Sequence, residues 1–320
     1  MKLLATIALL TTSSVVTAAP TFASSPSSPS SPNGEAPLPT ETTPRAAARG
    51  DDRGVEPKSD ALRPGVRVVA TADTAFRMAP LGAALVTGVY VRQTYGVDPS
   101  GRYESSYLQG GAGVMVTPAS IEPQLHAEYV PAPYLVLRAE LGGVRYFGAN
   151  YGLLSFDDAN AAFGDSELSA RRGDAHGAWA MKGSFSVTPR LKLGPVHLHN
   201  KLRITAFHFD DHGPYVYEAE NDTLLATTDV VLSSRTDVLA EVFGGPGART
   251  FMLGPMFDVT RTGDTQLTRT RLGGSAYFVP AERWANLRRP RLFAMAGVNL
   301  TDPNRAGEPY ATFGFGGDLE

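Results

Sequence analysis

The chain has 320 residues, a formal net charge of -3 and no cysteine. This near balance of charge argues against a nucleic-acid partner, and without disulfides the chain has to gain its stability elsewhere. After the N-terminus, no apolar run approaches the roughly 20 residues that a membrane-spanning helix needs. If the protein crosses a membrane, it does so with strands.

The N-terminal region has two parts that differ in composition. Residues 1–23 begin with MKLLATIALL, in which Lys2 precedes an apolar segment, and small residues follow. This order predicts a secretory signal peptide. Residues 24–64 are rich in serine, proline and charge, which predicts a disordered linker. The remainder, 65–320, is predicted to form the folded domain.

An alternation of apolar and charged residues is clearest in 196–209, VHLHNKLRITAFHF. Val196, Leu198 and Leu202 fall on one side of this segment, and His197 and His199 fall on the other. Alternation with a period of two predicts a strand with one apolar and one charged face. Several such segments match the roughly 9–11 residues of a tilted membrane-spanning strand.

Counting the alternating segments predicts about ten strands, with a range of 8 to 12. We place them at 83–95, 105–130, 133–148, 176–189, 194–209, 223–243, 248–262, 266–281, 289–302 and 309–319. The two faces exchange near Pro118 and Pro123, which indicates a bulge or an extra turn. Segment 67–78 is a further candidate strand and would bring the number to about twelve.

Turn and loop lengths are unequal along this region. Short interruptions such as 130–133 alternate with long polar ones at 150–176 and 210–222, and the last strand carries Phe313 and Phe315. With the signal peptide and the alternation, these features make 85–320 resemble the general class of Gram-negative outer-membrane β-barrel proteins. Members of that class typically end on an aromatic residue, whereas this chain ends in GGDLE.

The resemblance implies an all-β, antiparallel, up-and-down transmembrane β-barrel in the outer membrane. It implies membrane lipid around the apolar faces, the barrel-assembly machinery as a partner during insertion, and a linker in the periplasm. No cofactor is predicted.

The charged faces of the strands are then predicted to line the interior. The predicted lumen-lining residues are Arg92, Glu128, Arg138, Glu140, Lys182, His197, His199, Lys201, Arg203, Asp229, Arg235, Asp237, Arg269 and Arg271. Both signs are present, so the interior is either a closed network of ion pairs or a narrow channel for small solutes.

Three groups of residues are secondary candidates for chemistry. His197 and His199 have the spacing of metal ligands but need a third ligand from another strand. The pair Asp210 and His212 resembles the Asp-His pair of the omptin proteases, although the second, Asp-x-Asp pair of that family is absent from the barrel portion. His126 and Ser184 would serve a lipid hydrolase only if the strand register brought them together.

These observations favour a non-enzymatic protein that is structural or passes small solutes through a narrow polar lumen. One alternative is an outer-membrane hydrolase, either an omptin-like protease or a lipid hydrolase, acting at the extracellular rim. The other is a soluble periplasmic β-barrel or sandwich that binds a ligand, in which a second sheet would cover the apolar faces.

Overall fold

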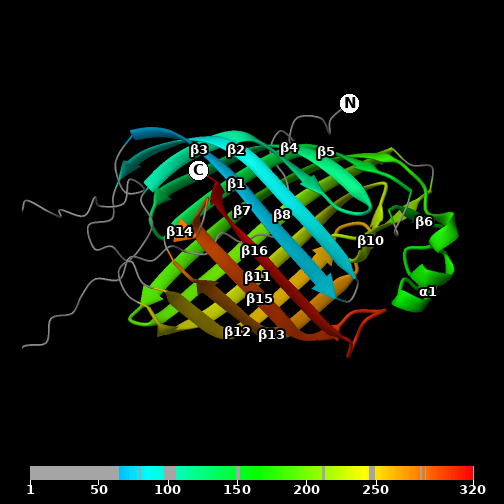
Figure 1. Ribbon diagram of the computed structural model, residues 1–320. Coiled ribbons are helices and arrows are strands. Elements are labelled where there is room, and N and C mark those ends of the chain that lie inside the picture. The colour runs from blue at the N-terminus through cyan, green and yellow to red at the C-terminus, as the bar shows by residue number, and fades with distance from the viewer. Residues whose placement is uncertain are drawn as a thin grey trace, which may run out of the picture.

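Twelve long antiparallel strands form the wall of a barrel in the computed structural model (Figure 1). The structure describes residues 65–78, 81–96, 106–148, 152–210, 213–244, 249–281, 283–284 and 286–319, and the side chain of residue 289 is not described. The predicted signal peptide (1–23) and linker (24–64) lie outside the described residues. The wall strands are β1 (Gly65–Met78), β2 (Gly82–Gly96), β3 (Ser106–Val116), β4 (Ser120–Ala132), β5 (Leu135–Tyr146), β7 (Trp179–Leu193), β8 (Val196–Asp210), β11 (Thr228–Phe243), β12 (Thr250–Thr262), β13 (Thr268–Val279), β15 (Leu287–Thr301) and β16 (Pro309–Leu319).

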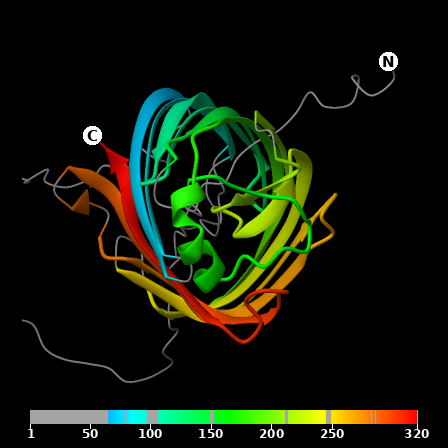
Figure 2. The same ribbon diagram turned by 90° about the vertical axis from the view of Figure 1, so that its right-hand side faces the viewer.

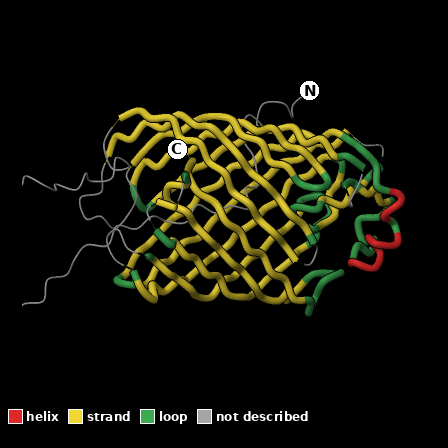
Figure 3. Tube along the Cα trace, in the orientation of Figure 1, coloured by secondary structure: helices red, strands yellow, loops and turns green. Residues whose placement is uncertain are grey.

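The wall closes on itself without a free edge. Each long strand pairs with the long strands that precede and follow it along the chain, and β16 pairs with β1 from Ala70↔Leu319 to Met78↔Ala311. The short strand β14 (Arg283–Trp284) pairs with β15 at the rim. Because every wall strand has two neighbours, its backbone groups are hydrogen-bonded within the wall, as a spanning sheet requires. The tilted strands are evident in Figure 3.

The prediction of about ten strands is wrong in number, and two features account for the difference. Segment 65–78 is the wall strand β1, and segment 105–130 is two strands rather than one. Between those two strands, Thr117 N donates to Ser120 O at 2.9 Å, while Thr117 Oγ1 accepts from the backbone N–H of Ala119 and Ser120. The exchange of faces near Pro118 is therefore an extra turn.

The two ends of the barrel differ. At one end, Ala132 and Leu135 are joined by two residues, as are Leu193 and Val196. At the other end, which we call the loop end, long connections follow β5 and β8 and carry elements of their own. These elements are β6 (Leu154–Phe156), α1 (Asp165–Ala170), the 3-10 helix η2 (Arg172–Asp174), β9 (Tyr215–Glu218) and β10 (Thr223–Ala226).

A cap lies over the loop end and consists of β6, α1 and η2. Figure 2, which faces this end, shows α1 across the opening of the barrel. β6, β9 and β10 form a three-stranded sheet separate from the wall. Its core is apolar and comprises Leu154, Phe156, Phe163, Leu168, Tyr217, Leu224 and Leu267. The cap is thus a small packed layer, held to the barrel through side chains rather than through the strand ladder of the wall.

The wall is apolar outside, and its charged side chains lie inside together with apolar clusters such as Leu239, Met252 and Phe293. On β8, Leu202 is 49% exposed whereas His197 is 1% exposed, and the two kinds of residue alternate along the strand. The same contrast separates Leu125 from Glu122 on β4. No second sheet covers these outward side chains among the described residues, so the apolar faces point away from the molecule. Among those same residues, no helix is both long and apolar enough to cross a bilayer.

Candidate functional site in the barrel interior and at its mouth

The fourteen predicted lumen-lining residues all lie on the sheltered side of the wall. Those that are buried are Glu128, Glu140, Lys182, His197, His199, Asp229, Asp237 and Arg269. Those that are partly buried are Arg92, Arg138, Lys201, Arg203, Arg235 and Arg271. The alternation in the sequence therefore predicted on which face of each strand these charged side chains lie. Their role in lining a path for solutes remains a prediction.

Many of these side chains form ion pairs with residues on the same strand or on the adjacent strand. Arg138 donates to Glu140 and lies 3.7 Å from Glu128. Arg235 donates to Asp237 at 2.8 Å, and Ser275 Oγ donates to the same carboxylate at 2.7 Å. Such pairing offsets the cost of removing each charge from bulk water. Most of the charges on the interior faces of β4, β5 and β11 in these groups therefore have a partner of opposite sign.

The histidine pair does not converge on a common third ligand. His199 Nε2 lies 3.2 Å from Asp237, whereas His197 Nε2 lies 3.4 Å from Glu241. Among the described residues, no group of three histidine, cysteine or acidic side chains is placed to hold a metal ion. The two imidazoles are thus joined to separate carboxylates of β11.

Of the secondary catalytic candidates, Asp210, His126 and Ser184 lie in the described part of the chain. Asp210 is exposed at the end of β8, opposite Trp179 of β7, and His212 lies outside the described residues. The ring of His126 meets Tyr90 edge-on at 4.8 Å, while Ser184 Oγ accepts from Arg203 Nε at 3.1 Å. His126 and Ser184 therefore have different immediate partners.

A feature that sequence reasoning missed is a hairpin at the mouth, made of β9 and β10 with the turn 219–222 between them. We call residues 215–226 the acidic hairpin. Arg77 of β1 donates to the backbone oxygens of Ala219 and Glu220, and Lys182 of β7 donates to the Glu220 carboxylate. The turn thus lies against the interior face of the wall, and its partners come from strands far apart in sequence.

Arginines from β13 hold the opposite side of the same turn. Arg269 donates to the backbone oxygens of Asn221 and Asp222, the latter at 3.1 Å. Arg271 lies 3.8 Å from the Asp222 carboxylate. We call Arg77, Lys182, Arg269 and Arg271 the mouth ring, because these four cations surround the turn at the loop end. The wall also supplies two carboxylates here, Glu122 beside Lys182 and Asp258 opposite Arg271 in the strand register.

Asp222 joins the acidic hairpin to the cap and the wall. It is fully buried, accepts a hydrogen bond from Tyr217 Oη at 2.8 Å and lies 2.8 Å from Arg305 Nε. Its backbone has φ 52, a left-handed conformation that aspartate tolerates in a turn. Burial by itself raises the pKa of Asp222, but Arg269, Arg305 and Arg77 outweigh burial, so its pKa lies below the ordinary value.

The lowered pKa makes the docking of the hairpin sensitive to acid. A carboxyl whose pKa is depressed in the folded state stabilises that state above its unfolded pKa, and this contribution is lost as the pH falls through the folded pKa. We expect digestion of the hairpin by an acid-active protease to rise below the ordinary aspartate pKa of 3.8. Because Asp222→Asn removes the titrating group, the difference between the two proteins should be large at neutral pH and shrink in acid.

The comparison with Asp222→Asn is needed because the pKa of a second carboxyl in the hairpin is shifted in the opposite direction, upward. Burial raises the pKa of Glu218, with Glu220 adding to the effect. Glu218 alone would therefore favour the docked hairpin at lower pH. A difference between wild type and Asp222→Asn that stayed constant from neutral to acid pH would contradict the role given to Asp222.

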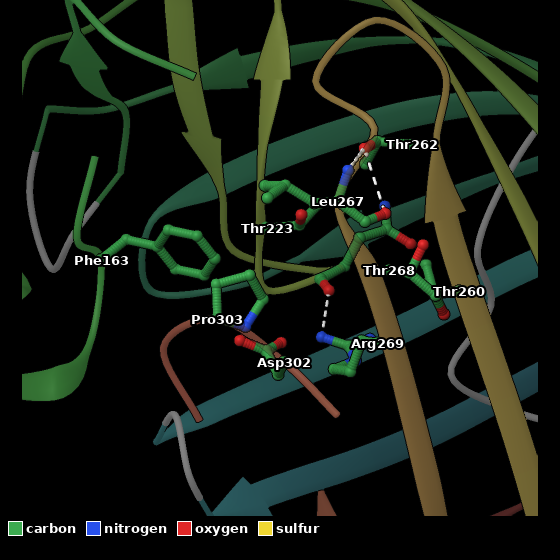
Figure 4. Close-up of a pocket in the computed structure, with 10 residues that line it drawn as sticks. Phe163, Thr223, Thr260, Thr262, Leu267, Thr268, Arg269, Asp302 and Pro303 are labelled. Atoms are coloured by element: carbon green, nitrogen blue, oxygen red, sulfur yellow. Dashed lines mark hydrogen bonds between the residues drawn. The ribbon is translucent and has the colours of Figure 1, made fainter. Parts of the chain in front are cut away.

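A small cavity lies between the cap, the acidic hairpin and the β12–β13 loop (Figure 4). Phe163 closes it from the cap side, Leu267 and Thr262 from the loop side, and Arg269 and Asp302 from the barrel side. Thr262 Oγ1 accepts from Leu267 N at 2.8 Å, so the loop wall is fixed by its own hydrogen bonds. The cavity is part of the packing that seats the hairpin.

Comparison with known proteins gives likeness of fold. No family model and no curated protein matches the chain. Among solved structures, the beta domain of the Bordetella autotransporter BrkA has a TM-score of 0.41 and 12% identity, over 80% of this chain and 99% of that one. An outer membrane channel from Pseudomonas putida F1 has a TM-score of 0.37 and 10% identity, over 82% and 98%. OmpT, an outer membrane protein of Vibrio cholerae, has a TM-score of 0.33 and 9% identity, over 80% and 99%.

The class of the protein follows from its own barrel. A closed antiparallel wall, an exposed apolar exterior and an ionic interior are the features of a transmembrane β-barrel. The fold is that of a closed antiparallel transmembrane β-barrel.

Proposed function

We propose that the protein is an outer-membrane channel that passes small polar solutes through a narrow lumen, with the cap and the acidic hairpin covering its outer mouth. In this proposal, residues 1–23 direct export and are removed, and 24–64 are a linker on the periplasmic side. Membrane lipid surrounds the apolar exterior, and the barrel-assembly machinery inserts the chain.

The observation that carries the proposal is the division of the wall into an apolar outside and a charged inside. A soluble β-barrel or sandwich would have to cover side chains such as Leu125, 61% exposed, and Met181, also 61% exposed. Lipid covers them in the proposed location.

The orientation follows from the ends of the barrel. Short turns of bacterial outer-membrane barrels face the periplasm, and the longer loops face outward. The loop end, with α1 and the acidic hairpin, is therefore the outer mouth. β1 begins and β16 ends at the other rim, which agrees with a linker on the periplasmic side.

Conductance of the purified, folded protein in a planar bilayer tests the proposal. We expect discrete channels in a fraction of insertions for wild type, and a larger open fraction when the cap is loosened by Asp222→Asn. A heat-dependent shift in gel mobility shows in each case that the barrel is folded. Absence of conductance from both folded proteins would refute solute passage and leave a structural role.

A further inference from the structure

The cations of the mouth ring contact oxygen atoms of the acidic hairpin in the way that a binding site contacts an anionic ligand. Three of the ring cations donate to oxygens of the hairpin: Arg77 and Arg269 to backbone carbonyls, and Lys182 to the Glu220 carboxylate. Arg269 and Arg271 also lie 3.6 and 3.8 Å from the Asp222 carboxylate. Guanidinium and ammonium groups that gather around carboxylates form strong, charge-assisted hydrogen bonds.

The acids of the hairpin have different tasks. Glu218 accepts from the backbone N–H of Glu220 at 2.9 Å and of Asn221 at 2.7 Å, so it shapes the turn. Glu220 and Asp222 instead turn to the wall, toward Lys182 and the arginines. The part of the hairpin presented to the mouth ring is therefore a pair of carboxylates on a short turn.

The hairpin lies outside the strand ladder of the barrel, although its Val216 and Leu225 pack against apolar residues of the wall. β9 and β10 pair with each other and with β6, and the wall strands form a different sheet. No ladder bond of the twelve-stranded wall has to break for the turn 219–222 to withdraw. Withdrawal would leave the cations of the mouth ring facing the lumen with Glu122 and Asp258 as the neighbouring wall carboxylates.

More positive charge stands behind the mouth ring, near the middle of β8. Lys201 and Arg203 lie two residues apart on the interior face. Within the described part of the chain, the side chain of Lys201 makes no hydrogen bond or ion pair, and Arg203 Nε donates to Ser184 Oγ, a neutral group. Arg203 Nη2 is buried without a partner. Lysine and arginine of this kind are the side chains that line anion-conducting pores.

We infer that the lumen selects small anionic solutes bearing carboxylate or phosphate groups, and that Glu220 and Asp222 are a tethered anion that occupies the entry site in their place. An incoming anion competes with the acidic turn for the mouth ring and then meets Lys201 and Arg203. This inference rests on the proposed channel function and adds the substrate class and the site that recognises it.

Ion selectivity tests the inference with three proteins, each checked for folding by heat-dependent gel mobility. Reversal potentials are measured in planar bilayers across a KCl gradient for wild type, Glu220→Gln/Asp222→Asn and Arg77→Gln/Arg269→Gln. We expect chloride to be preferred over potassium in wild type, the preference to grow severalfold when the tethered acids are neutralised, and to fall severalfold when the ring arginines are removed. Glu167→Gln/Asp174→Asn, an equal change of charge on exposed cap residues, should resemble wild type.

A second measurement does not depend on conductance. Inorganic phosphate, compared with chloride at equal ionic strength, should protect folded Glu220→Gln/Asp222→Asn from thermal unfolding, and protect Arg77→Gln/Arg269→Gln much less. Free phosphate and phosphate-bearing organic solutes share this chemistry, and block of the current by one but not the other distinguishes them.

The outcomes separate the two proposals. A conducting barrel that prefers potassium in wild type and in Glu220→Gln/Asp222→Asn would overturn the anion site and leave the channel. Absence of conductance in every folded variant would overturn the channel. In that case phosphate protection that depends on Arg77 and Arg269 would still support the anion site, and its absence would overturn that as well.

Discussion

Replacing Arg305 by methionine is expected to release the cap and the acidic hairpin from the mouth of the barrel. The Arg305 side chain is fully buried, and it lies 2.8 Å from Asp222, 2.8 Å from Asp165 and 3.2 Å from Glu308. Removing one partner of a buried ion pair costs roughly 3–5 kcal/mol, because the remaining charge is left without compensation. Asp222 would lose its nearest cation but keep Arg269 at 3.6 Å and the Tyr217 hydrogen bond, so we expect the lower end of this range, and the other two carboxylates are partly exposed.

The measurement is limited proteolysis of 154–174 and 215–226 in the folded barrel. A loss of about 3 kcal/mol corresponds to an increase of roughly a hundredfold in the open population. Arg172→Met removes an exposed arginine from the same cap and should have little effect. Equal cleavage of Arg305→Met and Arg172→Met would show that the buried arginine does not hold the cap.

Introducing arginine at Leu202 is expected to destabilise the inserted barrel strongly. Leu202 lies near the middle of β8 and is 49% exposed on the apolar exterior. Arginine at the midplane of a membrane β-barrel costs about 2–4 kcal/mol, and the cost falls to about 0–1 kcal/mol near the interfaces. Val196 begins the same strand and lies on the same face, so Val196→Arg is a matched control at a different depth.

Denaturant titrations in lipid vesicles, followed by heat-dependent gel mobility, compare the two variants. Leu202→Arg should unfold at a lower denaturant concentration than Val196→Arg, because only the former places its charge deep in hydrocarbon. In a water-soluble barrel both arginines would be solvated alike. Equal midpoints for the two variants would therefore contradict membrane placement of the exterior.

Most of the wall could be predicted from the alternation of residues, since a barrel in lipid demands apolar residues on one side of each strand. Strand β1 was predicted only as a candidate, because such a prediction depends on how clearly the two faces of a strand differ in polarity. Apolar residues occur on both of its faces, since Val69 and Ala75 lie inside beside Asp73, and the exterior carries the small residues Ala70 and Ala72. In segment 105–130 the glycines of β3 carry no side chain that marks a face, and a three-residue turn exchanges the two faces between β3 and β4.

The mouth was less accessible to sequence reasoning, because its contacts join residues distant in the chain. Arg77 and Glu220 are separated by 143 positions, and neither residue indicates the other. An acidic loop such as EAEND is usually solvated, and whether it folds inward depends on the cations that strands place at the rim. The sequence offered one signal: it contains both this acidic loop and arginines near the ends of strands, namely Arg77, Arg269 and Arg271.

The pairing of the last strand with the first has a consequence for the connectivity of the wall. Leu319 lies opposite Ala70, and the same antiparallel ladder that joins every other pair of wall strands joins these two. The twelve wall strands therefore follow one another in a circle, and the chain ends lie where β16 meets β1. The backbone hydrogen bonds at this junction are of the same kind as those at the other eleven junctions between wall strands. Topologically, the position of the ends along this circle is arbitrary, and what distinguishes one sector from another is the loops and charges that it carries.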